Sequence, residues 1–165
     1  MKLNELNIEL SRKLAEIKEV IESDTLKDII GVEAVNHFKE SFTNEGFTNE
    51  SLTRWEEVKR RTPSSPWYGH SGQLGGFTQA RTLAKILHGE TGELQNSIRY
   101  IPILNGVRIV NSAPYAAVHQ FGLPAKIYSK KEFKMPARPF MGKSVELQRK
   151  ITEKIEKEII KIIKK

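Results

Sequence analysis

Histidines are the first residues to test for chemistry, because an imidazole serves as general base, proton shuttle or metal ligand near neutral pH. The sequence has four histidines and no cysteine. No two histidines have the helical zinc-site spacing of HxxxH or HExxH, and the absence of thiols excludes a cysteine nucleophile and a thiolate zinc site. In each local context the pattern favours a structural role over a catalytic one. The four are His37, His70, His88 and His119.

A glycine-rich stretch at residues 69–76, GHSGQLGG, invites comparison with phosphate-binding loops. It lacks a closing Lys-Ser or Lys-Thr pair, no apolar strand precedes it, and the GxGxxG pattern is absent. The adjacent carboxylates Glu56 and Glu57 would point apart on a helix, so they are not expected to share a proton. The sequence therefore predicts no catalytic residues, no cofactor and no metal, and we expect a protein that is not an enzyme.

Two basic clusters leave nucleic-acid binding as an alternative function. Cationic side chains can meet phosphates, and neighbouring aromatic rings can stack on bases. Against this, the sequence contains no zinc finger, RNP motif or helix-turn-helix pattern. A solvated basic loop is therefore the simpler interpretation. The first cluster is Lys59, Arg60 and Arg61; the second is Lys126, Lys130, Lys131, Lys134 and Arg138, interleaved with Tyr128 and Phe133.

The length of 165 residues fits one domain with an arm, and the net charge is +7. No apolar run approaches the ~18–20 residues that cross a bilayer, and the N-terminus lacks the apolar core of a signal peptide. We therefore expect no membrane contact and a reducing cytoplasm as the place of synthesis. The charge is uneven, at −5 for residues 1–53, +8 for 54–142 and +4 for 143–165. Such asymmetry suits nucleic-acid binding or head-to-tail contact between subunits.

Apolar periodicity predicts two helices at the N-terminus. In residues 3–22, leucine and isoleucine recur at spacings of three or four, with charged residues on the other face. A second helix follows, capped by Asp24 or Thr25, and Gly46 suits its C-terminal stop. We treat residues 1–23 as an N-terminal helical extension and 24–165 as the main domain.

The middle of the chain combines breakers with one clear β signal. Residues 62–80 hold two prolines and four glycines, which predicts a long irregular loop that a neighbouring subunit would order. A short helix is expected at 81–88. Two β-rich runs within 98–112 flank Asn105-Gly106, a pair typical of a type I′ hairpin turn.

The C-terminal third predicts a short helix closed by Gly122, extended segments over 124–140 and one long helix from Ser144. Residues 54–61 suggest another short helix, with Trp55 facing inward. The expected class is α+β: N-terminal helices, a small antiparallel sheet containing the hairpin 98–112, and the long C-terminal helix packed across it.

Several segments then occur in a fixed order. The order is similar to that of the phage virion morphogenesis family, the tail completion proteins of contractile-tailed phages and related prophages. The resemblance covers about residues 30–165; the extension 1–23 is less typical, and the loop varies in such proteins. The segments are ARTLAKIL (80–87), TGELQNSI (91–98), VRIVNSAPYAAVHQFG (107–122) and MPARPFMGKS (135–144), preceded by Trp55 and Thr62.

The resemblance implies a non-enzymatic virion part that completes the head-proximal end of the tail and helps head–tail joining. Its implied partners are tail tube, terminator or neck proteins, and it would form a homo-oligomeric ring. DNA contact would be indirect. The implied locations are the virion and, during assembly, the host bacterial cytoplasm.

Site residues follow from the motifs. We expect Gly92 to permit a turn that places Leu94 inward, and Arg138 to pair with a carboxylate of its own chain or of an adjacent subunit. Tyr115, His119 and Phe121 should pack the short helix against the sheet, with His119 or Gln120 binding buried main-chain groups. The candidate assembly interface is Trp67, Tyr68, Lys130, Lys131 and Arg138; the motif residues expected to be structural are Trp55, Gly92, Leu94, Tyr115, His119, Phe121, Gly122, Pro136, Pro139 and Phe140.

Overall fold

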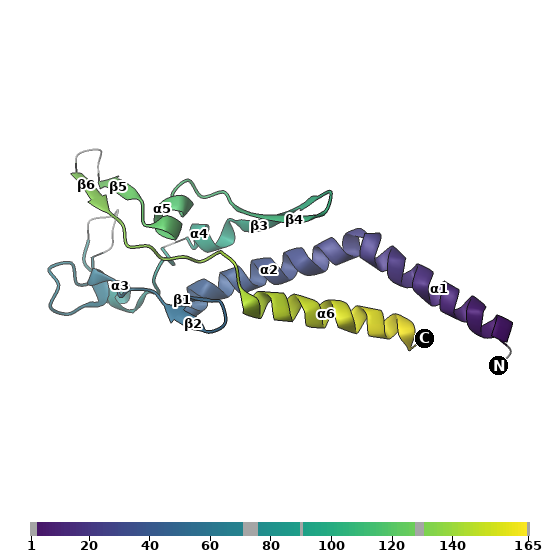
Figure 1. Ribbon diagram of the computed structural model, residues 1–165. Coiled ribbons are helices and arrows are strands. Elements are labelled where there is room, and N and C mark those ends of the chain that lie inside the picture. Colours follow the sequence, from purple (N-terminus) through teal and green to yellow (C-terminus); the bar gives the residue numbers. More distant parts are fainter. Residues whose placement is uncertain (1–2, 71–75, 90, 128–130, 165) are drawn as a thin grey trace.

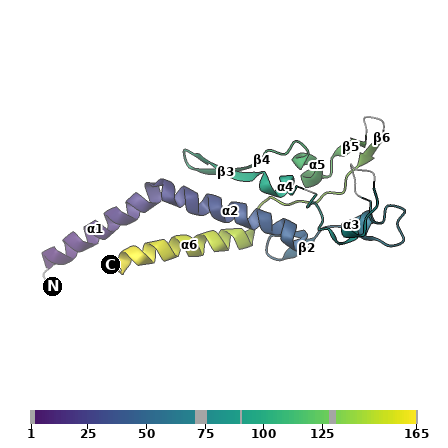
Figure 2. The same cartoon turned by 180° about the vertical axis from the view of Figure 1, so that it is seen from behind.

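The computed structural model describes residues 3–70, 76–89, 91–127 and 131–164. Long helices occupy one end of the molecule, and short hairpins and turns occupy the other (Figure 1). Both termini lie at the helical end, as the reverse view also shows (Figure 2). The α+β class predicted from the sequence is confirmed.

The two N-terminal helices are α1 (Leu3–Glu22) and α2 (Asp24–Asn44). They are separated by Ser23, whose backbone is extended and whose hydroxyl donates to Val20 O at 2.8 Å. The expected caps were wrong: Ser23 itself is the N-cap of α2, without a side-chain cap bond, and Glu45 in the left-handed conformation ends the helix. Gly46 instead begins a strand, where a side chain would collide with the facing main chain.

All the strands that the structure describes belong to three separate antiparallel hairpins. The first is missed by the sequence reading, because strands of three residues are too short to show an alternating pattern. Trp55 N closes it with a hydrogen bond to Glu45 O at 2.8 Å. The hairpins are β1 (Gly46–Thr48) with β2 (Leu52–Arg54), β3 (Ile98–Ile103) with β4 (Gly106–Asn111), and β5 (Pro124–Ile127) with β6 (Lys131–Lys134).

The hairpin predicted at 98–112 is present, but its turn differs from type I′. Ile103 pairs with Gly106, so Leu104 and Asn105 are the two loop residues. Neither has the positive φ that type I′ requires, and Gly106 takes φ 150° at the start of β4. Gly106 therefore lies at the start of β4, directly after the loop, and is not one of the two loop residues.

The remaining helices are shorter, except the last. Ser144 caps that last helix by accepting a hydrogen bond from Leu147 N at 3.1 Å, and its hydroxyl donates to Thr48 O at 2.8 Å. The cap thus joins the start of the C-terminal helix to β1. The helices are η1 (Lys59–Arg61), α3 (Gln79–Leu83), α4 (Glu93–Asn96), α5 (Ala116–Phe121) and α6 (Val145–Ile163).

Helix α2 is the centre of the packing. The β3–β4 hairpin lies on it, with the ring of Tyr100 directly over Gly31, and α6 runs along another side of it (Figure 1). Lys150 pairs with Glu40 at 3.1 Å across the α2–α6 contact. The prediction that α6 packs across the hairpin is therefore corrected. The hairpin and α6 each pack on α2: the hairpin lies over the small residue Gly31, and α6 pairs with a carboxylate, Glu40.

The core gathers where α2, the β1–β2 hairpin and the segment before α6 meet. Phe42 and Phe140 are the largest fully buried side chains, with ring centroids 5.2 Å apart. Trp55 packs on Phe42, and its indole N–H donates to Pro139 O at 2.8 Å. The prediction that Trp55 faces inward is therefore confirmed. The PARPFMG motif, which precedes α6, is anchored in the core by its buried Phe140.

Removing residues 1–23 is expected to leave a cooperatively folded chain that is about 1–2 kcal/mol less stable. Helix α1 keeps several large apolar side chains exposed, and it contacts α6 near the C-terminus, where Lys13 Nζ donates a hydrogen bond to Ile163 O at 2.8 Å. Chemical denaturation followed by circular dichroism checks this. A shortened chain that unfolds without cooperativity would contradict the proposed boundary at residue 23.

A basic pocket as the candidate functional site

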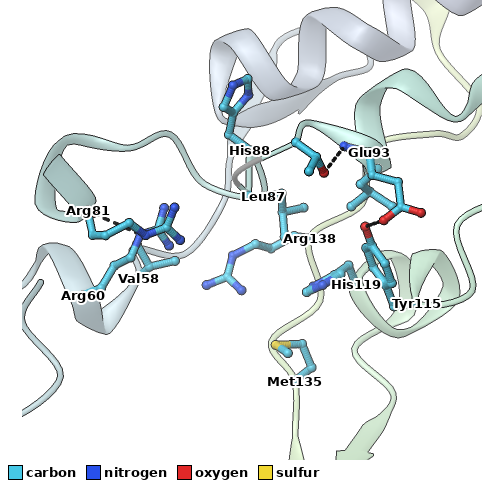
Figure 3. Close-up of a pocket in the computed structure, with 13 residues that line it drawn as sticks. Val58, Arg60, Arg81, Leu87, His88, Glu93, Tyr115, His119, Met135 and Arg138 are labelled. Carbon is cyan, nitrogen blue, oxygen red and sulfur yellow. Dashed lines mark hydrogen bonds between the residues drawn. The ribbon is translucent and has the colours of Figure 1, made fainter. Parts of the chain in front are cut away.

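A pocket of about 290 Å³ opens at the hairpin end of the molecule. Residues from η1 and α3 form one side, and residues from α4 and α5 form the other (Figure 3). Three arginines, Arg60, Arg81 and Arg138, supply much of its polar lining. Its apolar lining comes from Val58, Leu87, Leu94 and Met135.

The wall over residues 79–89 departs from the helix expected at 81–88. Helix α3 ends at Leu83, in the middle of the predicted helix, and the Leu83 side chain is 80% exposed. Beyond it, main-chain groups bind side chains from elsewhere: Ile86 N donates to the Glu45 carboxylate at 2.7 Å. The Arg60 guanidinium donates to the carbonyl oxygens of Arg81, Ala84 and Lys85 at 3.2, 2.8 and 2.8 Å.

This wall ends in a strained residue. Leu87 has φ 58°, a conformation that non-glycine residues rarely adopt. Tertiary hydrogen bonds to the preceding segment hold it there, in place of another turn of helix. The helix signal of the sequence is therefore overridden by Glu45 and Arg60, which come from other parts of the chain.

The carboxylate of Glu45 is held in place by a positively charged neighbour, Arg61. The carboxylate binds Arg61 at 2.6 Å, and Arg61 also lies 3.4 Å from Glu57. Partial burial tends to raise the pKa of Glu45, but the hydrogen bonds from Ile86 N and Arg61 outweigh it and lower that pKa. Arg61 and Glu45 thus stabilise the wall, and Arg60, from the same basic cluster, faces the pocket.

Arg138 does not make the predicted pair with a carboxylate of its own chain. It is 5% exposed, and its Nε and Nη2 donate to Glu56 O at 3.3 and 3.0 Å. Its main-chain N donates to His119 O at 2.7 Å. Burial lowers the pKa of its guanidinium, opposed by the charges of Glu56 and Glu57, yet arginine stays protonated in proteins.

Tyr115 and His119 form the opposite wall. The Tyr115 hydroxyl donates to Glu93 Oε2 at 2.6 Å; burial and this hydrogen bond raise the pKa of Tyr115 to about 12. His119 Nδ1 is buried and has no hydrogen-bond partner among the described residues. Burial first, and then the charge of Arg138, lower the pKa of His119, so the ring is neutral at pH 7.

The packing role predicted for Phe121 is wrong, because its side chain is 68% exposed. Gln120 performs the main-chain binding predicted for His119 or Gln120. Its Oε1 accepts from Phe140 N at 3.0 Å and Met141 N at 3.2 Å, and its Nε2 donates to Met141 O at 2.6 Å. This one amide therefore ties α5 to the PARPFMG segment that carries Arg138.

Two glycines shape the surroundings as the motifs suggest. Gly92 has φ 64°, and Leu94 after it is buried at 3% exposure, which confirms the predicted turn. Gly122 has φ 65° and ends α5, and a Cβ there would lie 2.9 Å from Met135 O. Both positions need the backbone freedom of glycine.

The other predicted interface residues do not line the pocket. Trp67 and Tyr68 lie on the 62–80 loop and are 51% and 43% exposed. Lys130 and loop residues 71–75 lie outside the described residues, and Lys131 begins β6. Pro136 is half-buried, and Pro139 is exposed while its carbonyl binds Trp55.

The sequence reading missed the pocket itself. It assigned Arg60 to a surface cluster and no role to Arg81, because no spacing along the chain connects these residues with Arg138. The sequence feature that could have indicated the pocket is the use of arginine at these positions in a lysine-rich chain, since a guanidinium can bind several carbonyl oxygens at once.

Stability should fall as the pH drops through about 6.5, the ordinary pKa of histidine. The unfolded chain takes up a proton there, whereas buried His119, facing Arg138 and Tyr115, resists protonation in the folded state. Unfolding curves between pH 7.5 and 5 check this against a His119→Gln variant, whose stability should fall less. Identical pH profiles for both chains would contradict the assignment.

Within the described ranges, no group of three acidic or histidine side chains is placed to hold a metal ion. No described helix is long and apolar enough to cross a bilayer.

The comparisons with known proteins connect these elements. A family model described as the phage virion morphogenesis family matches residues 59–160, which contain the three pocket arginines, Gln120 and most of α6. Searches of curated proteins and of solved structures each found no match. The family match spans more than half of the chain, so the chain belongs to the phage virion morphogenesis family.

Proposed function

We propose that this protein is a structural part of a phage or prophage virion that completes the head-proximal end of the tail and helps join it to the filled head. The family match over residues 59–160 carries the proposal. The matched region contains the PARPFMG anchor, the pocket and the exposed loop residues Trp67 and Tyr68. The protein would act in the virion and be assembled in the host cytoplasm.

The arginines and the tyrosine of the pocket suit binding, beside two histidines, His88 and His119, that also line it. Its dominant polar groups are arginines, which do not accept protons at physiological pH. Tyr115, with a pKa of about 12, is a poor proton donor near neutrality. These groups bind and position, so binding is the function that we assign to the site.

Exposed apolar side chains support assembly into a ring with tail tube, terminator or neck proteins as neighbours. Helix α1 leaves Leu6, Leu10 and Leu14 about half exposed along one helical stripe. Trp67 and Tyr68 are exposed on the segment between η1 and α3, and α3 lies at the opposite end of the molecule from α1 (Figure 1). Contiguous exposed apolar surface marks protein contacts. The acidic 1–53 part and the basic 54–142 part suit head-to-tail contacts between copies.

Deleting the gene from its phage tests the role in tail completion directly. We expect electron microscopy to show filled heads and separate tails, with joining restored when the protein is supplied in trans. Joined, infectious particles in its absence would overturn the proposal. A chain that is dispensable for tails but binds duplex DNA with a steep salt dependence would instead support the alternative, a basic nucleic-acid-binding module.

The double substitution Trp67→Ser and Tyr68→Ser is expected to abolish particle joining while changing stability by less than about 0.5 kcal/mol, because both side chains are exposed. Complementation titre and denaturation of the purified chain check the two parts. The matched control is Leu83→Ser, which removes an 80% exposed side chain that we do not place in the interface. Equal losses of titre in both chains would remove Trp67 and Tyr68 from it.

A further inference from the structure

Carboxylates act on the pocket arginines only from a distance within the part of the chain that the structure describes, namely Glu56 and Glu57 on Arg138 and Glu45 on Arg60. Among the ion pairs of the described residues, none joins Arg60, Arg81 or Arg138 to a carboxylate within 4.0 Å. Arg60 and Arg138 bind main-chain carbonyls, which carry no net charge. Figure 3 shows the Arg138 guanidinium turned toward those of Arg60 and Arg81.

Two buried nitrogens of the pocket are also unsatisfied. Arg81 Nε and His119 Nδ1 have no hydrogen-bond partner among the described residues, although both atoms are inaccessible to solvent. Leaving a buried polar group unpaired costs about 1–3 kcal/mol, and more when it is charged. In native structures such a group marks local strain, a catalytic role, or a place that a water, an ion or a ligand completes.

Repulsion between neighbouring arginines adds to the free-energy cost of the unpaired groups. Burial and the neighbouring cations Arg81, Arg61 and Arg138 lower the pKa of Arg60, opposed by Glu45. Glu93, the one described carboxylate in the lining, is taken by the Tyr115 hydroxyl. The free chain therefore holds a concave cluster of cations that an entering anion would stabilise.

We propose that this pocket receives a carboxylate from a second copy of the chain, bound by Arg81 and by the edge of Arg138 that does not face Glu56. The inference deepens the proposed function, on which it rests for the ring that would bring two copies together. In this proposal Arg60 mainly stabilises the wall of the pocket, because its guanidinium is already bonded to Ala84 O and Lys85 O of the same chain.

Shape and lining favour a carboxylate over a nucleic-acid phosphate. Arg138 is 5% exposed inside a hollow, whereas duplex phosphates lie on a convex rod and meet protruding cations. The volume, about 290 Å³, is at the small end of ligand pockets, roughly 300–1,000 Å³. The apolar residues Val58, Leu87 and Met135 suit the aliphatic stem of a glutamate.

Charge complementarity points to the partner copy as the donor. Acidic residues predominate in residues 1–53, and three of them, Glu19, Glu22 and Asp24, are exposed at the bend between α1 and α2. In both views this bend lies away from α3, α4 and α5, whose residues line the chain's own pocket (Figures 1 and 2). A contact from the bend of one copy to the pocket of the next is head-to-tail, which closes into a ring when the rotation permits.

Glutarate, which is glutamate without its amino group, tests the pocket by titration calorimetry. The titrated chain carries Glu19→Gln, Glu22→Gln and Asp24→Asn, so that no second copy competes. Adding Arg81→Gln should weaken glutarate binding at least tenfold without loss of stability, because the buried Nε of Arg81 has no hydrogen-bond partner to lose among the described residues. Arg108→Gln, which removes an exposed arginine of β4, should leave binding unchanged.

Absence of glutarate binding, or equal binding by the Arg81→Gln and Arg108→Gln chains, would overturn the carboxylate site. Binding of inorganic phosphate but not glutarate would overturn it in favour of a phosphate ligand. Gene deletion tests the assembly role separately, so that role can stand if the pocket proposal fails.

The oligomer mass, measured by light scattering, tests the donor. Arg81→Gln alone and the triple acidic variant alone should each weaken self-association at least tenfold, and Arg108→Gln should not. Unchanged association in either of the first two chains, or a wild-type chain that does not self-associate at any concentration, would overturn the second copy as the source of the carboxylate.

Discussion

Phe140→Ala is expected to lower the free energy of unfolding by about 3–5 kcal/mol, the cost of removing a buried phenylalanine ring. Phe140 is 0% exposed and packs on Phe42 with ring centroids 5.2 Å apart. Its carbonyl accepts a hydrogen bond from Ser41 Oγ at 3.2 Å. The lost ring would leave a cavity between α2 and the segment before α6, which urea denaturation measures directly.

Phe121→Ala provides the matched control. It removes the same ring from a side chain that is 68% exposed, so the change in stability should stay within about 0.5 kcal/mol. If the two variants lost similar amounts of stability, the assignment of Phe140 as the anchor of the PARPFMG segment would be wrong. The pair also separates two aromatic residues that the sequence reading treated alike.

Gln120→Leu is expected to cost about 3 kcal/mol, because the amide makes three hydrogen bonds to the main chain of two residues. Without it, Phe140 N and Met141 N lose their acceptor, and Met141 O loses a donor at 2.6 Å. Partial exposure of the site keeps the loss below the full cost of three buried groups. Thermal and urea unfolding give the magnitude.

Gln120→Glu retains the two acceptor bonds and removes the donor to Met141 O, so its loss should be smaller than that of Gln120→Leu. A glutamate variant that is as unstable as the leucine variant would show that the N–H groups of Phe140 and Met141 do not depend on this side chain. Hydrogen exchange of these two amides gives the local measurement. Faster exchange in Gln120→Leu alone is the expected result.

Local patterns predicted the long elements well. Helices α1 and α6 show apolar residues at helical spacing over many turns, so their existence follows from periodicity. Helix α2 was also predicted, although its apolar residues lie on more than one face. The hairpin 98–112 follows from its two β-rich runs, although its loop is not the predicted type I′ turn, and the stop at Gly122 follows from the backbone freedom of glycine. Errors arose where partners from elsewhere replaced local ones, as when Glu45 captured Ile86 N and ended the helix predicted at 81–88.

Side-chain direction was harder to predict than backbone class. Phe121 and Tyr115 were both expected to pack inward, but α5 has only six residues and buries Ala116 instead. Arg138 was expected to pair with a carboxylate of its own chain or of an adjacent subunit, and within the described part of its own chain the fold gave it Glu56 O instead. In both cases the local sequence was compatible with more than one direction of the side chain, and contacts from distant segments selected one of them.

The sequence by itself determined the family, the α+β class, the long helices and the identity of the anchoring motif, because these depend on residue order and on interactions between near neighbours. Only the tertiary structure decided that Arg60, Arg81 and Arg138 share one hollow. These residues come from three separate segments that are held together by Glu45, Gln120 and Phe140. Convergence of this kind is set by packing and long-range hydrogen bonds, which leave no periodic trace in the chain.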